Sequence, residues 1–158
     1  MDRKSIAMSS HGMLDESNCW KVSGARRADD FFAAVSLLVP DATHMFLEGS
    51  PAPDIETLLA AAADDADYAA PRGTLWSWPQ KEQRFSVRAS AELFVQLSEA
   101  ASKHAELEIC SHVHFYRGRE ALVQWFDAFL EPLLVSKAVA RGRVEQFASA
   151  VGGTVSDG

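Results

Sequence analysis

The feature that most constrains the fold is a pair of strand-like stretches separated by a short turn, in CSHVHFYRGREALVQWFD from Cys110 to Asp127. Strands joined this closely must pair antiparallel, because a parallel pair needs a crossover of about a dozen residues or more. Side chains in a strand alternate between two faces. With the turn at Arg117-Gly118, one face carries Cys110, His112, His114, Tyr116, Val123, Trp125 and Asp127, and the other carries Val113, Phe115, Leu122, Gln124 and Phe126. We expect the second face to lie on the core, although a loop of odd length would reverse the assignment.

The rest of the chain predicts an α+β domain in which helices cover a sheet. Apolar residues recur at helical spacing in ARRADDFFAAVSLLV, IETLLAAAA, AELFVQLSEAASKHA and about Ala140 to Val151, with N-caps expected at Asp54 and Ser90 and a stop at Gly152-Gly153. Strand-like stretches are ATHMFLEG, TLWSWP, EQRFSVR, the hairpin and PLLVS, while SNCWKVSG suits a short strand or a loop. Because strands follow one another without helices between them, we expect a mostly antiparallel sheet of about five strands with about four amphipathic helices.

Length and composition indicate one domain. The chain has 158 residues, 47% of them hydrophobic, which is enough to bury a core without disulfides or metals. We expect this domain over 16–153, a flexible leader over 1–15 and a flexible tail over 154–158. No apolar run approaches the roughly 20 residues that cross a bilayer, and the N-terminus lacks the apolar block of a signal peptide. Two unpatterned cysteines, Cys19 and Cys110, favour a cytoplasmic protein with free thiols.

The charge of the chain limits its partners. A formal net charge of −7, from 22 acidic and 15 basic residues, argues against direct binding of nucleic acid, which needs a basic surface. The same charge suits docking on a basic protein, although solubility alone would also explain it. The cluster Asp64, Asp65 and Asp67 lacks the spacing of a calcium loop, so we expect a solvated turn that could steer such a partner.

Two chemical interpretations of the hairpin compete. His112 and His114 alternate on one strand, about 6.6 Å apart, and with Cys110 or Asp127 they could supply three ligands to zinc or another transition metal. Alternatively, Cys110 could act as a nucleophile with one of these histidines as its base. A reactive thiol needs an electropositive, partly exposed setting, and Cys110 lies beside Glu108 in the expected strand.

Two other interpretations involve neither a metal nor catalysis. Histidine, tyrosine and tryptophan offer apolar area with a polar tip, so a recognition surface would comprise His112, His114, Tyr116, Trp125 and Asp127, extended by Trp76 and Trp78 on a neighbouring strand. In the other, a helix covers this face, the histidines bond to the backbone, and Cys110 is an inert buried side chain.

The sequence therefore favours a non-enzymatic acidic binding protein of the cytoplasm, in the concrete form of an inhibitor or immunity-type protein that docks on a basic partner. No glycine-rich phosphate loop, nucleophile elbow or H-E-x-x-H helix is present. The alternative is a small metal-binding protein or metal-dependent enzyme built on Cys110, His112 and His114. A homodimer is a further expectation if an apolar sheet face that includes Trp125 is left uncovered.

Overall fold

A computed structural model of the protein describes residues 13–39, 44–63 and 83–157. The strands are β1 Cys19–Ser23, β2 His44–Gly49, β3 Gln83–Arg88, β4 His112–Arg117, β5 Glu120–Trp125, β6 Leu133–Ser136 and β7 Thr154–Asp157. The helices are α2 Ala28–Ala34, α3 Pro53–Ala61, α5 Ala91–Ala101 and α6 Arg141–Val151, with short 3-10 segments η1 Glu16–Asn18, η2 Val35–Leu37 and η4 Glu106–Glu108. All seven strands form one antiparallel sheet in the order β3-β2-β4-β5-β6-β1-β7, which confirms the expected α+β class.

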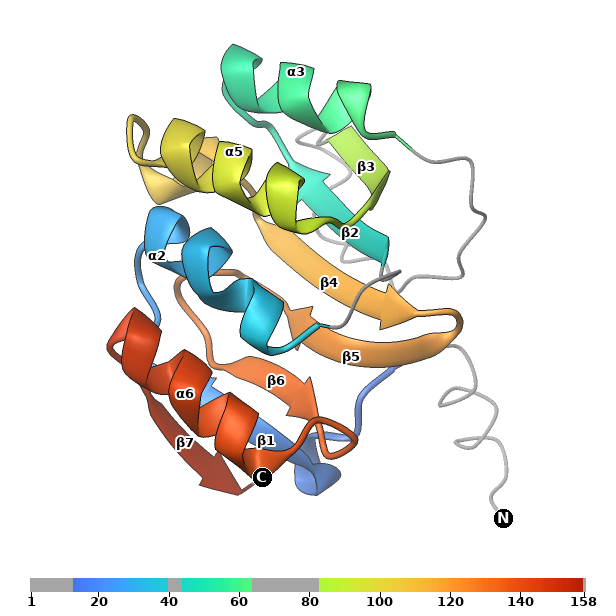
Figure 1. The fold of residues 1–158 in the computed structure, drawn as a ribbon, viewed down its shortest axis with the longest axis vertical. Coiled ribbons are helices and arrows are strands. Elements are labelled where there is room, and N and C mark those ends of the chain that lie inside the picture. Colours follow the sequence, from blue (N-terminus) through green and yellow to red (C-terminus); the bar gives the residue numbers. More distant parts are fainter. Residues whose placement is uncertain (1–12, 40–43, 64–82, 158) are drawn as a thin grey trace.

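The four helices lie side by side on one face of the sheet (Figure 1). Helix α2 packs between α5 and α6, and α3 packs on the outer side of α5. Among the described residues no helix lies on the opposite face of the sheet. The described part of the chain therefore has two layers, and the two sheet faces have different surroundings in it.

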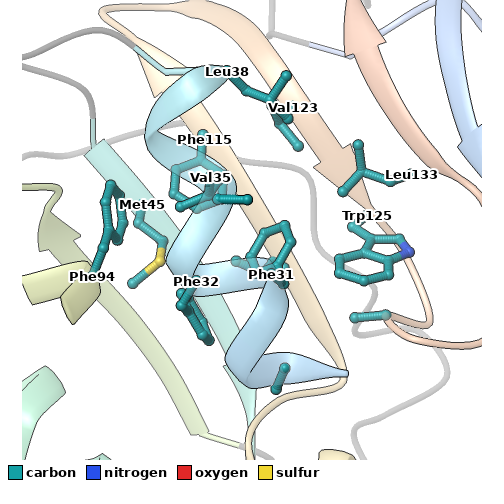
Figure 2. Close-up of a cluster of buried hydrophobic side chains, with 14 of the residues drawn as sticks. Phe31, Phe32, Val35, Leu38, Met45, Phe94, Phe115, Val123, Trp125 and Leu133 are labelled. Atoms are coloured by element: carbon teal, nitrogen blue, oxygen red, sulfur yellow. The ribbon is translucent and has the colours of Figure 1, made fainter. Parts of the chain in front are cut away.

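The core lies between the helices and the sheet, and Phe31 of α2 is at its centre. Its ring lies 5.0 Å from those of Phe32 and Trp125, and 6.1 Å from that of Phe115. All four side chains are at most 1% exposed. Figure 2 shows this cluster, with α2 crossing over the strands that carry Phe115 and Trp125. Burial of aromatic side chains of this size supplies much of the hydrophobic stabilisation of a domain.

The helix ends lie where local capping interactions predict them, with one exception. The Ser90 hydroxyl accepts the Leu93 N–H at 3.1 Å, so Ser90 is the expected N-cap of α5. Gly152 ends α6 in the left-handed conformation, with φ +74°. The prediction that Asp54 caps α3 is wrong. The helix begins at Pro53 with Ala52 as its cap, because proline is well suited to the first turn, where its missing N–H is not needed.

The hairpin register differs from the prediction. Arg117 pairs with Glu120, so Gly118 and Arg119 form the turn, which by itself would leave the predicted faces unchanged. Further along, Tyr116 pairs with Ala121 but Phe115 pairs with Val123, so the pairing skips Leu122. This β-bulge reverses the facing of the rest of β5. Val123 and Trp125 therefore face the helices, while Gln124 and Phe126 share the side of His112 and His114, opposite to the expectation.

The structure also corrects the expectation for the C-terminal tail. Residues 154–157, expected to be flexible, form β7 and pair with β1. A side chain at Gly153 would collide with the Ser23 carbonyl, so glycine lets the chain pass close to β1. The sheet thus has seven strands rather than about five. The expected strand TLWSWP, the acidic cluster at 64–67 and most of the expected leader lie outside the described residues.

Candidate functional site

The sheet face away from the helices is polar, and we call it the polar face. Its rows follow from the strand register, in which partners across neighbouring strands point the same way. Three rows of side chains cross the strands. The first contains Arg84, Glu48 and His112, and the second contains Ser86, Phe46, His114, Gln124, Leu134 and Lys21. The third contains Arg88, His44 and Tyr116. Four of these polar side chains, Glu48, His114, Tyr116 and Gln124, are at most 2% exposed. Buried polar groups in such number require hydrogen-bond partners.

The two histidines bond to the backbone around the end of β5. The Trp125 N–H donates to Nδ1 of His114 at 3.3 Å, and the Asp127 N–H donates to Nδ1 of His112 at 3.0 Å. An Nδ1 atom that accepts a hydrogen bond carries no proton, so the neutral rings hold their proton on Nε2. The rings of both histidines contact Phe126, and that of His114 stacks parallel to Phe46.

His114 is held neutral by its surroundings. Burial lowers the pKa of His114 to about 3, and the neighbouring His112 adds to the shift. Its Nε2 atom has no hydrogen-bond partner among the described residues. A neutral, fully buried imidazole cannot exchange protons with a substrate in this conformation, so His114 does not have the properties of a general acid or base near neutral pH.

Three further polar side chains of this face, those of Gln124, Tyr116 and Glu48, also have partners. The Gln124 amide donates to the Tyr116 hydroxyl at 3.1 Å and accepts the Leu14 N–H at 2.8 Å. Burial raises the pKa of Tyr116 to about 12, so its phenol stays neutral. The carboxylate of Glu48, directly across from His112, forms an ion pair with Arg84 at 3.4 Å.

The predicted site residues therefore separate into four groups. His112, His114 and Tyr116 share the polar face as expected, but they are buried. Trp125 lies at 0% exposure on the helix side, where its indole N–H donates to the Glu131 carbonyl at 2.6 Å. Cys110 and Asp127 lie beyond the ends of β4 and β5 rather than within them. Trp76 and Trp78 lie outside the described residues.

Neither chemical interpretation finds support in this geometry. In the described part of the chain, no group of three His, Cys, Asp or Glu side chains is placed to hold a metal ion. Nδ1 of each histidine is occupied by a backbone N–H. Cys110 is fully buried, and an added Cβ at Gly49 would lie 2.9 Å from the Cys110 Cα, so backbone packs tightly there. A thiol in such a setting is poorly accessible to a substrate.

A second region, not anticipated from the sequence, is formed by loops at one end of the sheet. Strands β1, β2 and β5 end there, β4 and β6 begin there, and helices α2 and α3 start from it (Figure 1). These loops and the first turns of α2 and α3 carry the carboxylates of Asp29, Asp30, Asp54, Glu106, Glu108, Asp127 and Glu131. We call this region the acidic end.

Hydrogen bonds join the loops of the acidic end to one another. The Ser111 N–H donates to the Glu48 carbonyl, the Ala128 N–H to the Ser111 carbonyl and the Ala52 N–H to the Glu108 carbonyl, each at 2.8 Å. His104 contacts Asp54 at 2.8 Å and Glu108 at 3.5 Å. The Glu106 carboxylate accepts the Ala28 N–H at the start of α2. Loops joined in this way present a preorganised surface.

Two leucines project from this surface. Leu107 is 72% exposed between two glutamates, and Leu130 is 76% exposed in the loop after β5. The residues around Leu130 have unusual backbone conformations, because Asp127 and Phe129 have φ angles of +51° and +73°. Non-glycine residues in this region are strained, and such strain concentrates at functional sites. The Phe129 ring packs on Trp125 at 4.7 Å, which directs the neighbouring Leu130 outward.

Comparison with protein-family models, with curated proteins and with solved structures finds no match for the chain. Among the helices of the described residues, none has the length and apolar character that crossing a bilayer requires. Function must therefore be inferred from the residues themselves and their arrangement.

Proposed function

We propose that this protein is a non-enzymatic cytoplasmic binding protein, of the inhibitor or immunity type, that docks on a basic protein partner through its acidic end. The observation that carries the proposal is the pair of exposed leucines, Leu107 and Leu130, set among carboxylates on loops that are joined by hydrogen bonds. The net charge of −7 supports a basic partner, and two free, buried thiols suit a reducing compartment.

The carboxylates would act mainly on the rate of association. Arg27 neutralises part of the charge through Asp29 at 2.6 Å and Asp30 at 3.7 Å. Asp127 and Glu131 form no ion pair with other described residues. Exposed charges of one sign steer a partner of the opposite sign, and salt weakens this effect because the Debye length shortens.

The leucines would supply the apolar contact that holds the complex together. Each already lies in water, so its burial by a partner removes apolar area at about 25 cal/mol per Å². Preorganised loops reduce the entropy that binding would otherwise cost. The exposed polar groups around the leucines would form the rim of the interface.

The test compares three immobilised baits in a lysate with quantitative mass spectrometry: the wild type, the double variant Leu107→Ala/Leu130→Ala, and the control Val95→Ala. Val95 is 57% exposed on α5, away from these loops. We expect a basic protein that the wild type and the control retain equally. Its purified form should bind the double variant at least about tenfold more weakly, a loss of about 1.4 kcal/mol.

Salt provides the second readout. The association rate of the purified partner should fall several-fold between about 50 and 300 mM salt, and it should fall less for Asp127→Asn/Glu131→Gln. A partner that is acidic, or one whose retention is the same on all three baits, would refute docking through the acidic end.

A further inference from the structure

A pocket of about 290 Å³ opens on the polar face, away from the helices. Its floor is the cross-strand row Gln124, Leu134 and Lys21 on β5, β6 and β1, three strands that lie side by side in Figure 1. Phe126 lines one wall. Within this floor the Gln124 side chain is fixed, because both ends of its amide are hydrogen-bonded. The volume is at the lower limit for a small-molecule site, about 300 Å³.

Three charged side chains surround this pocket without pairing. Lys21, Glu16 and Glu131 all line it, yet no ion pair within 4.0 Å joins the ammonium to either carboxylate, and none of the three pairs with another described residue. On the helix side of the sheet, charges do pair: Lys137 with Asp157 at 2.7 Å, and Arg141 with Glu145 at 2.9 Å. The pocket thus holds one positive and two negative groups, all available to a ligand.

We propose that this pocket binds a free cationic α-amino acid of the arginine or lysine type. Such a ligand carries one carboxylate and two cationic groups, which is the charge complement of Lys21, Glu16 and Glu131. The Lys21 ammonium binds the ligand carboxylate, one glutamate binds the α-ammonium and the other binds the side-chain cation. The methylene stem of the ligand packs on Phe126 and Leu134, so its apolar part is also matched.

The alternatives fit less well on the same grounds. A neutral amino acid leaves one glutamate unpaired, and a simple amine leaves Lys21 facing a cation. A partner's arginine side chain, inserted from a protein, likewise brings no carboxylate. The pocket shares one carboxylate, Glu131, with the acidic end. The proposal does not rest on docking there, because none of its contacts involves Leu107 or Leu130.

The test is a chemical-shift titration of the ¹⁵N-labelled protein at low ionic strength with four probes. L-arginine should shift the Gln124 side-chain amide and the backbone amides of Lys21 and Leu134. We expect agmatine, which lacks the carboxylate, and L-citrulline, which lacks the side-chain cation, each to bind about fivefold more weakly. N-acetyl-L-arginine amide, which mimics a residue within a protein and lacks both the carboxylate and the α-ammonium, should bind more weakly than either. No saturable shift with L-arginine, or equal binding of all four probes, would overturn the proposal.

The variants assign the role of each charge. Lys21→Met should weaken L-arginine about fivefold but should not weaken agmatine, which has no carboxylate for the ammonium to bind, while Glu131→Gln should weaken both. Lys137→Met and Glu145→Gln, whose ion pairs lie outside the pocket, are the matched controls. If Lys21→Met and Lys137→Met bind L-arginine equally, the carboxylate contact is absent and the assignment is wrong. An unchanged amide spectrum before titration verifies that each variant is folded.

Discussion

Both faces of the sheet bury side chains, but the chemistry of the buried groups is opposite. On the helix face, Met45, Leu47, Phe115, Val123 and Trp125 are all fully buried and apolar. On the polar face, Glu48, His114, Tyr116 and Gln124 are buried to the same degree but need specific partners. The apolar face gains free energy from burial itself, whereas the polar face recovers through hydrogen bonds what desolvation costs.

Because the two faces differ in this way, we expect mutations and pH to change stability differently at each face. Apolar packing responds to lost volume and hardly to pH, because no group in it titrates. A polar cluster responds to protonation and to the loss of single hydrogen bonds, because an unpaired buried group costs free energy.

The largest effect should come from the helix face. Phe31→Ala leaves a cavity between α2, Phe115 and Trp125, and we expect the free energy of unfolding to fall by about 3–5 kcal/mol. The matched change on the polar face is Phe126→Ala, since Phe126 is only partly buried and contacts the rings of His112 and His114. That variant should lose about 1–2 kcal/mol. Equal losses in urea unfolding would remove the distinction between the faces.

The second effect belongs to the polar face and depends on pH. The pKa of His114 is about 3 in the folded protein and near 6.5 in the unfolded chain. Above pH 6.5 both states are neutral and the histidine adds no pH dependence. As the pH falls from about 6.5 toward 3, only the unfolded chain takes up the proton, so stability falls by about 1.4 kcal/mol per pH unit within that window.

Carboxylates also titrate in the lower part of this pH range. The effect of His114 must therefore be measured as a difference between the wild type and variants. The free energies of unfolding of the wild type, His114→Gln and His104→Gln should be compared from pH 7 to 4.5. Glutamine can still accept the Trp125 N–H but does not titrate. We expect His114→Gln to lose the extra slope between pH 6.5 and 4.5, and the partly exposed control at position 104 to keep it. Parallel curves for the wild type and His114→Gln would mean that His114 is charged in the folded protein.

Much of the fold could be predicted because the signals are local. Helical spacing identified α2, α5 and α6, Ser90 identified a cap, and two adjacent strand-like stretches required antiparallel pairing. The facing of β5 could not be predicted, because a bulge at Leu122 depends on how the whole strand fits its neighbours. Once Leu122 is skipped, Trp125 moves from the expected recognition surface into the core. Strand β7 was not predicted because TVSD does not alternate strongly between apolar and polar residues. Its strand conformation depends on pairing with β1.

The site was harder to predict for a related reason. The histidine pair was identified from its alternation, but its burial and its bonds to the Trp125 and Asp127 amides depend on tertiary contacts. The acidic end was missed because its carboxylates are far apart in the sequence and meet only through the strand order. The useful signal was present in ELE at 106–108, where an apolar residue stands between two acids just before a strand.

The smallest effect tests a single bond of the polar face. Tyr116→Phe removes the hydroxyl that accepts the Gln124 amide, and we expect a loss of about 1 kcal/mol with little change in packing volume. The matched change on the helix face is Leu47→Met, a swap of similar volume that creates no unpaired polar group. In a cycle with Gln124→Met, the coupling energy between positions 116 and 124 should be about 0.5–1.5 kcal/mol, and that between 47 and 124 should be near zero. If the 116–124 coupling is also near zero, the polar face is not stabilised by this bond. Its burial would then need another source of free energy.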